Sequence, residues 1–286
     1  MTRDDEKRVF RAMLLTGGFM VVEVAGGLLA GSLALLADAG HMLTDTAALG
    51  FAWIAFRLAR RPPDPQRSYG YHRFQILAAF LNGVILIAIV AWIAYEAVQR
   101  LNQPVEILGG LMLAVACVGL VVNLIAFAIL HAGSRDNLNV RGALLHVLGD
   151  LLGSLAAVVA ATVIITTGWT PIDPLLSMLV ALLILRSAWM LVRQSTHVLL
   201  EGTPAEVDVS RLKSELVETV ADVQDVHHVH VWTLTSGRLV MTLHAHVREG
   251  ADGQQTLRAI HSICRERFGV AHITVQIEYG QCADVA

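Results

Sequence analysis

The sequence predicts a bundle of six membrane-spanning helices followed by a small soluble α+β domain, and three observations support this fold class. Hydrophobic residues make up 55% of the 286 residues, only 16% are charged, and the mean hydropathy is +0.59, all unlike an ordinary soluble domain. Residues 1–200 hold 14 Lys/Arg against 12 Asp/Glu, whereas residues 201–286 hold 7 against 12. After Glu201 the long apolar runs stop and shorter helical and alternating patterns begin. We therefore expect a membrane domain over 1–200 and a soluble domain over 201–286.

Six apolar stretches have the length of about 20 residues that a helix needs to cross the hydrocarbon core. They lie at 12–31, 33–56, 75–98, 107–130, 143–167 and 172–192. Lys and Arg gather in the segments on the side of the termini, and the connections on the opposite side offer only Arg100. The positive-inside rule therefore predicts a multi-pass membrane protein with both termini in the cytoplasm.

The C-terminal part changes its hydrophobic period several times. VDVSRLKSELVETV from Val207 and TLRAIHSICRERF from Thr256 have helical spacing, whereas the stretches that start at Val226, Leu239 and His272 alternate. This pattern predicts the order helix, strand, strand, helix, strand, with a hairpin turn between the first two strands. The net charge of this part, seven basic minus twelve acidic residues, is −5, which argues against a nucleic-acid partner.

Ionisable residues lie inside two of the apolar stretches with the same spacing, His-x-x-x-Asp. His41 and Asp45 lie in the second stretch, and His146 and Asp150 lie in the fifth. Residues four apart share one helical face, and a buried carboxylate costs roughly 2.5 to 3.5 kcal/mol on insertion scales, so such residues usually mark an ion path. Two such faces predict a four-ligand cage between the helices.

The ligand set of this cage indicates a divalent cation. Two neutral imidazoles and two carboxylates balance its charge, and a tetrahedral set of two nitrogens and two oxygens suits Zn²⁺. The same groups can hold protons when the metal leaves, so an exchange of a cation for protons needs only this site. The alternative is that each pair is a hydrogen-bonded clamp between helices.

Three segments closely resemble the cation diffusion facilitators, a family of zinc-transporting secondary carriers. They are LADAGHMLTD at 36–45, GYHRFQILAAFLNG at 70–83 and ALLHVLGDLLGS at 143–154. The resemblance covers nearly the whole chain, and it implies six spans, a cytosolic ferredoxin-like αββαβ domain and a homodimer. It further implies export of Zn²⁺ from the cytoplasm against inward-moving protons, through a transport site at His41, Asp45, His146 and Asp150. Cd²⁺ and Co²⁺ stay open as further substrates, and the lack of a His-rich insertion favours a carrier of the bacterial inner membrane.

A second metal site is expected in the soluble domain, because seven of the 12 histidines fall between residues 227 and 272. The family's cytosolic zinc sites lie on these strands. The residues carried over are His230, His246, His272 and Glu278, with His244 as an alternative because the strand register is not fixed. Zn²⁺ would then be both the substrate and a regulatory ligand that draws two soluble domains together.

Three further residues are accessory candidates. Asp38 lies three residues before His41 and is expected either to orient its imidazole or to cap the helix. Glu23 is expected to line the approach to the metal or to bond a neighbouring helix, and His72, with Asp64 before it, is either a weak metal site or a solvated loop residue.

Other function classes remain as alternatives. A proton-driven metal importer would use the same site, and a membrane-anchored metal sensor would not need the paired His-x-x-x-Asp motifs. An intramembrane metal enzyme would need an open coordination position and a general base, and the sequence has no HExxH motif to supply them. We therefore expect a transporter and no enzymatic activity.

Overall fold

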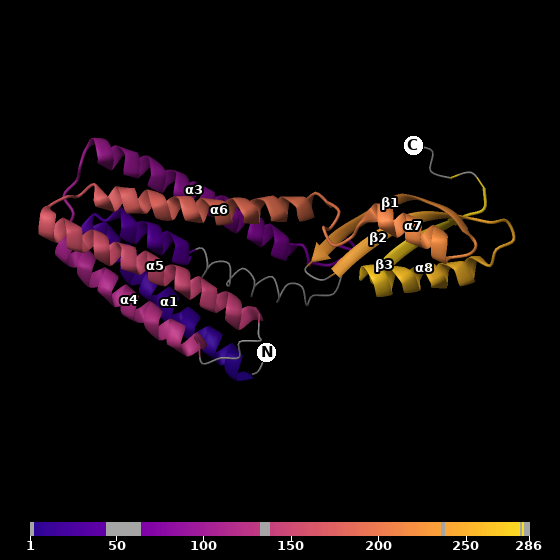
Figure 1. The fold of residues 1–286 in the computed structure, drawn as a ribbon, viewed down its shortest axis with the longest axis horizontal. Helices are drawn as coiled ribbons and strands as arrows, with labels where there is room; N and C mark the ends of the chain where they lie inside the picture. Colours follow the sequence, from indigo (N-terminus) through magenta and orange to yellow (C-terminus); the bar gives the residue numbers. More distant parts are fainter. Residues whose placement is uncertain (1–2, 44–63, 132–137, 236–237, 281, 283–286) are drawn as a thin grey trace. The chain divides into compact units, whose positions relative to one another are not determined.

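A computed structural model describes the chain except residues 1–2, 44–63, 132–137, 236–237, 281 and 283–286. The described residues form two compact units, which are treated separately. The first holds the residues up to 43 together with 79–192, and the second holds 64–78 together with 193–286 (Figure 1).

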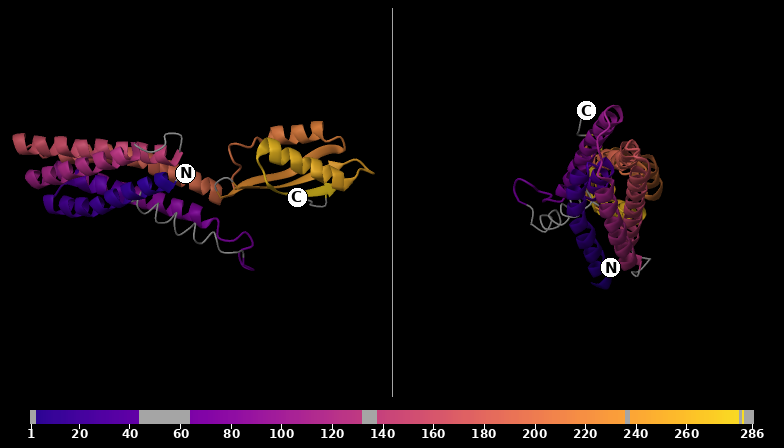
Figure 2. Two further views of the ribbon diagram at one scale, coloured as in Figure 1. Left: turned by 90° about the horizontal axis from the view of Figure 1, so that it is seen from below. Right: turned by 90° about the vertical axis from the view of Figure 1, so that its left-hand side faces the viewer.

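The first unit is a bundle of helices (Figures 1 and 2). They are α1 (Arg3–Ala30), a helix over Leu33–Leu43, α3 (Phe74–Asn102), α4 (Gly109–His131), α5 (Leu138–Thr167) and α6 (Ile172–Leu199). The start of α3 and the end of α6 belong to the second unit. Within the part of the chain that the structure describes, four helical segments are long and apolar enough to cross a membrane: α3, α4, α6 and residues Asp150–Thr167 of α5. Leu14–Ala30 and Leu33–Leu43 are shorter apolar helices among the described residues. The predicted membrane domain is confirmed, whereas the number of six crossings stays a prediction.

The Leu33–Leu43 helix lies between two groups of packed helices. Its residues Leu35 and Met42 pack into an apolar cluster with α1, α4 and α5. Leu33 and Ala37 pack into a second cluster, formed with α3 and α6. The helix that carries His41 therefore contacts both groups, and its position depends on how both pack.

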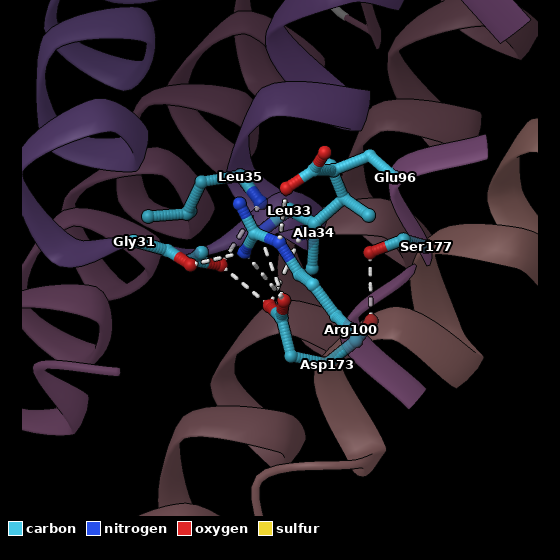
Figure 3. Close-up of polar contacts among 9 residues, drawn as sticks. Gly31, Leu33, Ala34, Leu35, Glu96, Arg100, Asp173 and Ser177 are labelled. Atoms are coloured by element: carbon cyan, nitrogen blue, oxygen red, sulfur yellow. Dashed lines mark hydrogen bonds and ion pairs between the residues drawn. The ribbon is translucent and has the colours of Figure 1, made fainter. Parts of the chain in front are cut away.

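A buried carboxylate from α6 caps the start of this helix (Figure 3). Asp173, fully buried, accepts hydrogen bonds from the Ser32 hydroxyl at 2.6 Å and from the N–H groups of Leu33 at 2.8 Å and Ala34 at 3.1 Å. The first N–H groups of a helix have no partner within the helix, and a negative charge there is favourable. Arg100 of α3, 3.9 Å away, offsets the charge of Asp173. One carboxylate thus ties α3, α6 and the helix of His41 together.

The second unit contains α7 (Val209–Thr219), β1 (Val223–Thr235), β2 (Arg238–Val247), α8 (Gly253–Phe268) and β3 (His272–Glu278), in the predicted order. The sheet order is β1-β2-β3, with β1 antiparallel and β3 parallel to β2. Both helices pack on one face of the sheet (Figures 1 and 2). Met241, Leu243, Ala245 and Val247 of β2 belong to the apolar core. Because side chains alternate along a strand, His244 points to the opposite face.

Candidate metal centres

Two of the four predicted transport-site residues meet between apolar helices. His41 Nε2 lies 4.0 Å from Asp150 Oδ1, and the side chains are 28% and 1% exposed. The contact joins the Leu33–Leu43 helix to α5, which are the two segments that carry the His-x-x-x-Asp motifs. The helical faces that the sequence pairs therefore oppose each other at these two residues.

The other two residues of the predicted cage are not placed in the same detail. Asp45 lies outside the described residues. His146 lies in α5, one turn before Asp150, and its side chain is also outside the described part. Their membership of the site stays a prediction.

Glu23 and Asp38 form a buried pair in the first unit. The residues are 1% and 4% exposed, and their carboxyl groups interact. The sequence offered no partner for Glu23, because the two residues lie on different helices. The contact favours one of the two expectations for Glu23, an interaction with the neighbouring helix that carries His41, and the role of Glu23 near the metal stays a prediction.

The described residues also contain one group that could hold a metal ion in the soluble domain. Its members are His227, His244, Glu278 and Cys282, each of which offers one ligand atom within 4.8 Å of all the others. Glu278 lies between the two imidazoles, with Oε1 3.0 Å from His244 Nδ1 and Oε2 3.1 Å from His227 Nε2. The Cys282 sulfur is 3.5 Å from the same nitrogen of His244.

The donor types and spacing of this cluster fit Zn²⁺. Zinc binds imidazole nitrogen, carboxylate oxygen and thiolate sulfur tetrahedrally at about 2.0 to 2.3 Å, which separates the ligand atoms by about 3.3 to 3.8 Å. The distances of 3.0, 3.1 and 3.5 Å lie close to this range. Asp225 Oδ2 lies 2.9 Å from His227 Nδ1, and a carboxylate in this position fixes which imidazole nitrogen faces the metal.

A β-bulge in β1 brings the histidines together. The pairing with β2 shifts between His227 and His230, and His228 takes a positive φ of 48° inside this shift. The His228 ring stacks on His244 at 4.9 Å and meets the edge of His227 at 5.3 Å. Strict alternation would place His227 and His228 on opposite faces, so the bulge supplies a cluster that the period of two does not predict.

Only some of the cytosolic-site residues expected from the resemblance lie in this cluster. His244 and Glu278 belong to the cluster of the described residues, whereas His230, His246 and His272 do not. His230 pairs with Thr242 beyond the bulge, and His272 is exposed with its ring against the edge of Tyr69. Sequence reasoning missed His227, because of the bulge, and Cys282, because it follows the last strand without any periodic signal.

Among the described residues, His72 and Asp64 hydrogen-bond to different residues and not to each other. Asp64 accepts hydrogen bonds from the Tyr71 hydroxyl at 2.9 Å and from the N–H of Arg67 at 2.8 Å, and together they hold its pKa below the usual value. His72 Nε2 lies 3.4 Å from Arg238 Nη1 of the β1–β2 hairpin. These contacts favour a structural role for His72 in the second unit over a shared metal site with Asp64.

The chemistry around Glu278 favours its ionised form. Burial raises the pKa of Glu278, but hydrogen bonds from Cys282 and Gln276 and the electrostatic influence of the nearby imidazoles of His244 and His227 outweigh burial and lower it below its ordinary 4.5. A carboxylate held ionised beside two imidazoles is available as a cation ligand.

Comparisons with known proteins match both units. Residues 9–200 match the cation efflux transmembrane domain, and residues 204–279 match the cytoplasmic domain of cation efflux proteins. The zinc transporter ZitB of Escherichia coli (strain K12) is 49% identical over 280 residues, 98% of this chain and 89% of the relative.

Two further relatives are more distant. A cadmium, cobalt and zinc/H⁺-K⁺ antiporter of Bacillus subtilis is 42% identical over 96% of this chain and 89% of its own length. The metal cation efflux system protein CzcD of Cupriavidus metallidurans is 40% identical over 99% of this chain and 90% of its own length.

Proposed function

The chain belongs to the cation efflux family, and on this basis we propose that it carries Zn²⁺ out of the cytoplasm in exchange for protons. Efflux of metal cations across a membrane is what the family and its relatives have in common. The proposal adds proton coupling and leaves Cd²⁺ and Co²⁺ as further substrates, which the name of the Bacillus subtilis relative suggests.

The contact of His41 with the buried Asp150 carries the proposal. A carboxylate and an imidazole 4.0 Å apart between apolar helices are close enough to share one cation after a small inward movement. Asp45 and His146 complete the proposed site, because each lies four positions in the sequence from one of these two residues, as in the His-x-x-x-Asp motifs. Two carboxylates and two neutral imidazoles bind Zn²⁺ without net charge, so the ion can be held between apolar helices at low cost.

Protons compete for the same ligands. An imidazole must be neutral and a carboxylate ionised to bind metal, so protonation weakens metal binding. We propose that protons entering from outside displace Zn²⁺ outward and reset the site. Each cycle then moves Zn²⁺ and protons in opposite directions.

The membrane arrangement is part of the proposal. The family match over 9–200 and the apolar helices support a multi-pass protein of a bacterial inner membrane. We propose six crossings with both termini in the cytoplasm, a ferredoxin-like cytosolic domain, and a homodimer formed in part by that domain.

We further propose that the cluster of His227, His244, Glu278 and Cys282 binds a regulatory Zn²⁺. Its mixed nitrogen, oxygen and sulfur donors suit zinc, and it lies in the unit that matches the cytoplasmic domain of the family. Zn²⁺ on this site reports cytosolic zinc, whereas the ion at His41 and Asp150 is the transported substrate.

Zinc flux into everted membrane vesicles with an imposed pH gradient tests the proposed function. We expect uptake of Zn²⁺ that follows the outward movement of protons from acidified vesicles, and loss of that uptake in Asp150→Asn, which keeps the shape but removes the charge. Glu106→Gln, which removes an exposed carboxylate of the α3–α4 connection, is the control and should transport like the parent.

The same assay separates the alternatives. Zinc movement in the reverse direction under every gradient would identify an importer. Absence of any flux from a correctly inserted protein would leave a sensor or an enzyme and overturn the proposal.

A further inference from the structure

The first unit holds a carboxyl pair that the proposed metal site does not use. Glu23 of α1 and Asp38 of the Leu33–Leu43 helix are almost fully buried, and their carboxyl groups interact. Two ionised carboxylates held close together repel each other strongly at low dielectric, so the pair favours holding one proton. The second oxygens, Glu23 Oε2 and Asp38 Oδ2, are buried without a hydrogen-bond partner among the described residues.

Glycines on two neighbouring helices make the room for this pair. A Cβ atom at Gly153 of α5 would stand 2.8 Å from Asp38 Oδ1, and one at Gly119 of α4 would stand 3.4 Å from Glu23 Oε1. A side chain at Gly153 would therefore displace the Asp38 carboxyl. The backbones of α4 and α5 therefore pack against the two carboxyl groups from two sides.

The same positions place the pair beside the proposed transport site. Gly153, against Asp38, lies three residues after Asp150 on α5, and Asp38 itself lies three residues before His41. Residues three apart lie on one helical face, about 5 to 6 Å apart at their Cβ atoms. The carboxyl pair therefore lies about one helical turn from both His41 and Asp150.

Acidic groups dominate this region. Besides Glu23 and Asp38, the described titratable groups are Asp150 of α5 and His41 of the Leu33–Leu43 helix. The sequences of α4 and of the apolar segments 14–30 and 33–43 contain no Lys or Arg. The α4 helix brings Gly119 and the amide of Asn123, which donates to Ser154 Oγ at 3.0 Å. No nearby basic side chain on these segments offsets the charge, so the pair favours holding a proton as long as no cation lies beside it.

We propose that Glu23 and Asp38 are a proton-binding site of the transport cycle, which holds one proton while the neighbouring metal site is empty and releases it when Zn²⁺ binds there. On release the O–H bond breaks, its electron pair stays on the carboxylate, and the proton leaves to water. The positive charge of the arriving metal drives this step because like charges repel strongly at low dielectric. The inference rests on the proposed function. It identifies the Glu23–Asp38 pair as a proton carrier whose residues are not metal ligands.

Proton release on zinc binding tests this proposal directly. Zn²⁺ is added to the weakly buffered full-length chain that carries His227→Ala and His244→Ala, so that only the membrane site responds, and released protons and bound zinc are counted. We expect Glu23→Gln and Asp38→Asn each to bind the same amount of Zn²⁺ at saturation while releasing one proton fewer per ion. Glu106→Gln, at an exposed carboxylate, is the control and should release as many protons as the parent.

Two outcomes overturn the proposal. An unchanged proton count in both variants makes the pair a static link between α1 and its neighbour, and a loss of bound Zn²⁺ makes the pair a cation ligand. Infrared difference spectra of the unsubstituted chain provide a second measurement if a variant does not fold. They should lose the band of a protonated carboxyl group when Zn²⁺ binds, and a spectrum without that loss also overturns the proposal.

Failure of this inference is distinguishable from failure of the proposed function. Vesicles of the parent that exchange Zn²⁺ for protons, together with a Glu23→Gln variant of unchanged proton count, refute only the role of the pair. Vesicles of the parent that move no Zn²⁺ refute the proposed function itself.

Discussion

At the residue scale, the burial of Asp150 is the feature that most needs a cation. Its side chain is 1% exposed on an apolar helix, and its ion pair with His41 spans 4.0 Å, longer than a charge-assisted hydrogen bond. A zinc ion bound tetrahedrally to both atoms would bring them about 0.5 Å closer, given bonds of about 2.0 to 2.2 Å. The site is therefore close to a metal-binding geometry and needs only a small closure.

Glu278 makes the stability of the zinc-free soluble unit depend on pH. Because its pKa is below the ordinary 4.5 in the folded protein, the folded state prefers the carboxylate, and this stabilisation is present above about pH 4.5 and lost as the pH falls through the lowered pKa. We expect Glu278→Gln to lower the Tm at neutral pH and this difference to shrink in acid. Thermal unfolding of metal-free full-length chain measures it, with the exposed Glu249→Gln as control. A pH-independent difference would contradict the account.

The residue patterns predicted the side-chain contacts of one candidate site better than those of the other. The spacing of His41 and of Asp150 in their motifs predicted a contact between two helices, because a helix has one period over its whole length. The strand period failed at His228, where a bulge inserts a residue and changes which side chains share a face. A bulge depends on the partner strand, so the single sequence does not contain it.

At the scale of elements, the Leu33–Leu43 helix is held at its start by three other segments. Asp173 caps it, Arg100 pairs with Asp173 and Glu96, and Arg100 also donates to the Gly31 carbonyl (Figure 3). Gly31 has φ +68°, a conformation that favours glycine in the turn before the helix. Asp173 was not singled out in the sequence, because its partners lie about 140 residues away in the chain.

Loss of this cap should destabilise the membrane unit and impair transport together. Breaking a buried ion pair costs roughly 3 to 5 kcal/mol, and the remaining Glu96 partner of Arg100 places Asp173→Ala near the lower end. Thermal unfolding in detergent and zinc flux measure the two effects. Ser177→Ala, which removes only a bond to the carbonyl of Asp173 within α6, is the matched control. If Asp173→Ala unfolds at the same temperature as this control, the cap does not hold the helix.

At the scale of the whole molecule, we expect the soluble domain to respond to zinc through its charge. Its twelve acidic against seven basic residues make two copies repel each other, and bound Zn²⁺ reduces that repulsion. An ion shifts a conformational equilibrium only by its differential affinity for the two states. Zn²⁺ on the cytosolic cluster is therefore expected to draw the domains of a homodimer together and favour transport.

Distances between labels on the two soluble domains test this regulation. We expect a zinc-dependent approach in the parent, and its loss, with a higher zinc concentration for half-maximal flux, when His227 and His244 are both replaced by Ala. The control replaces His230 and His246 by Ala, two histidines of the same sheet outside the cluster, and should behave like the parent. If the approach is lost when His230 and His246 are replaced, but not when His227 and His244 are replaced, the regulatory site lies at the residues predicted from the resemblance.

The central claim is that His41 and Asp150 hold the transported ion, and a zinc titration tests it most directly. The full-length chain with His227→Ala and His244→Ala isolates the membrane site, and calorimetry measures its affinity and stoichiometry. We expect one Zn²⁺ per protomer, and a loss of affinity greater than about tenfold when either His41→Ala or Asp150→Asn is added, since each removes a direct ligand. Zinc binding with unchanged affinity in Asp150→Asn would contradict the account.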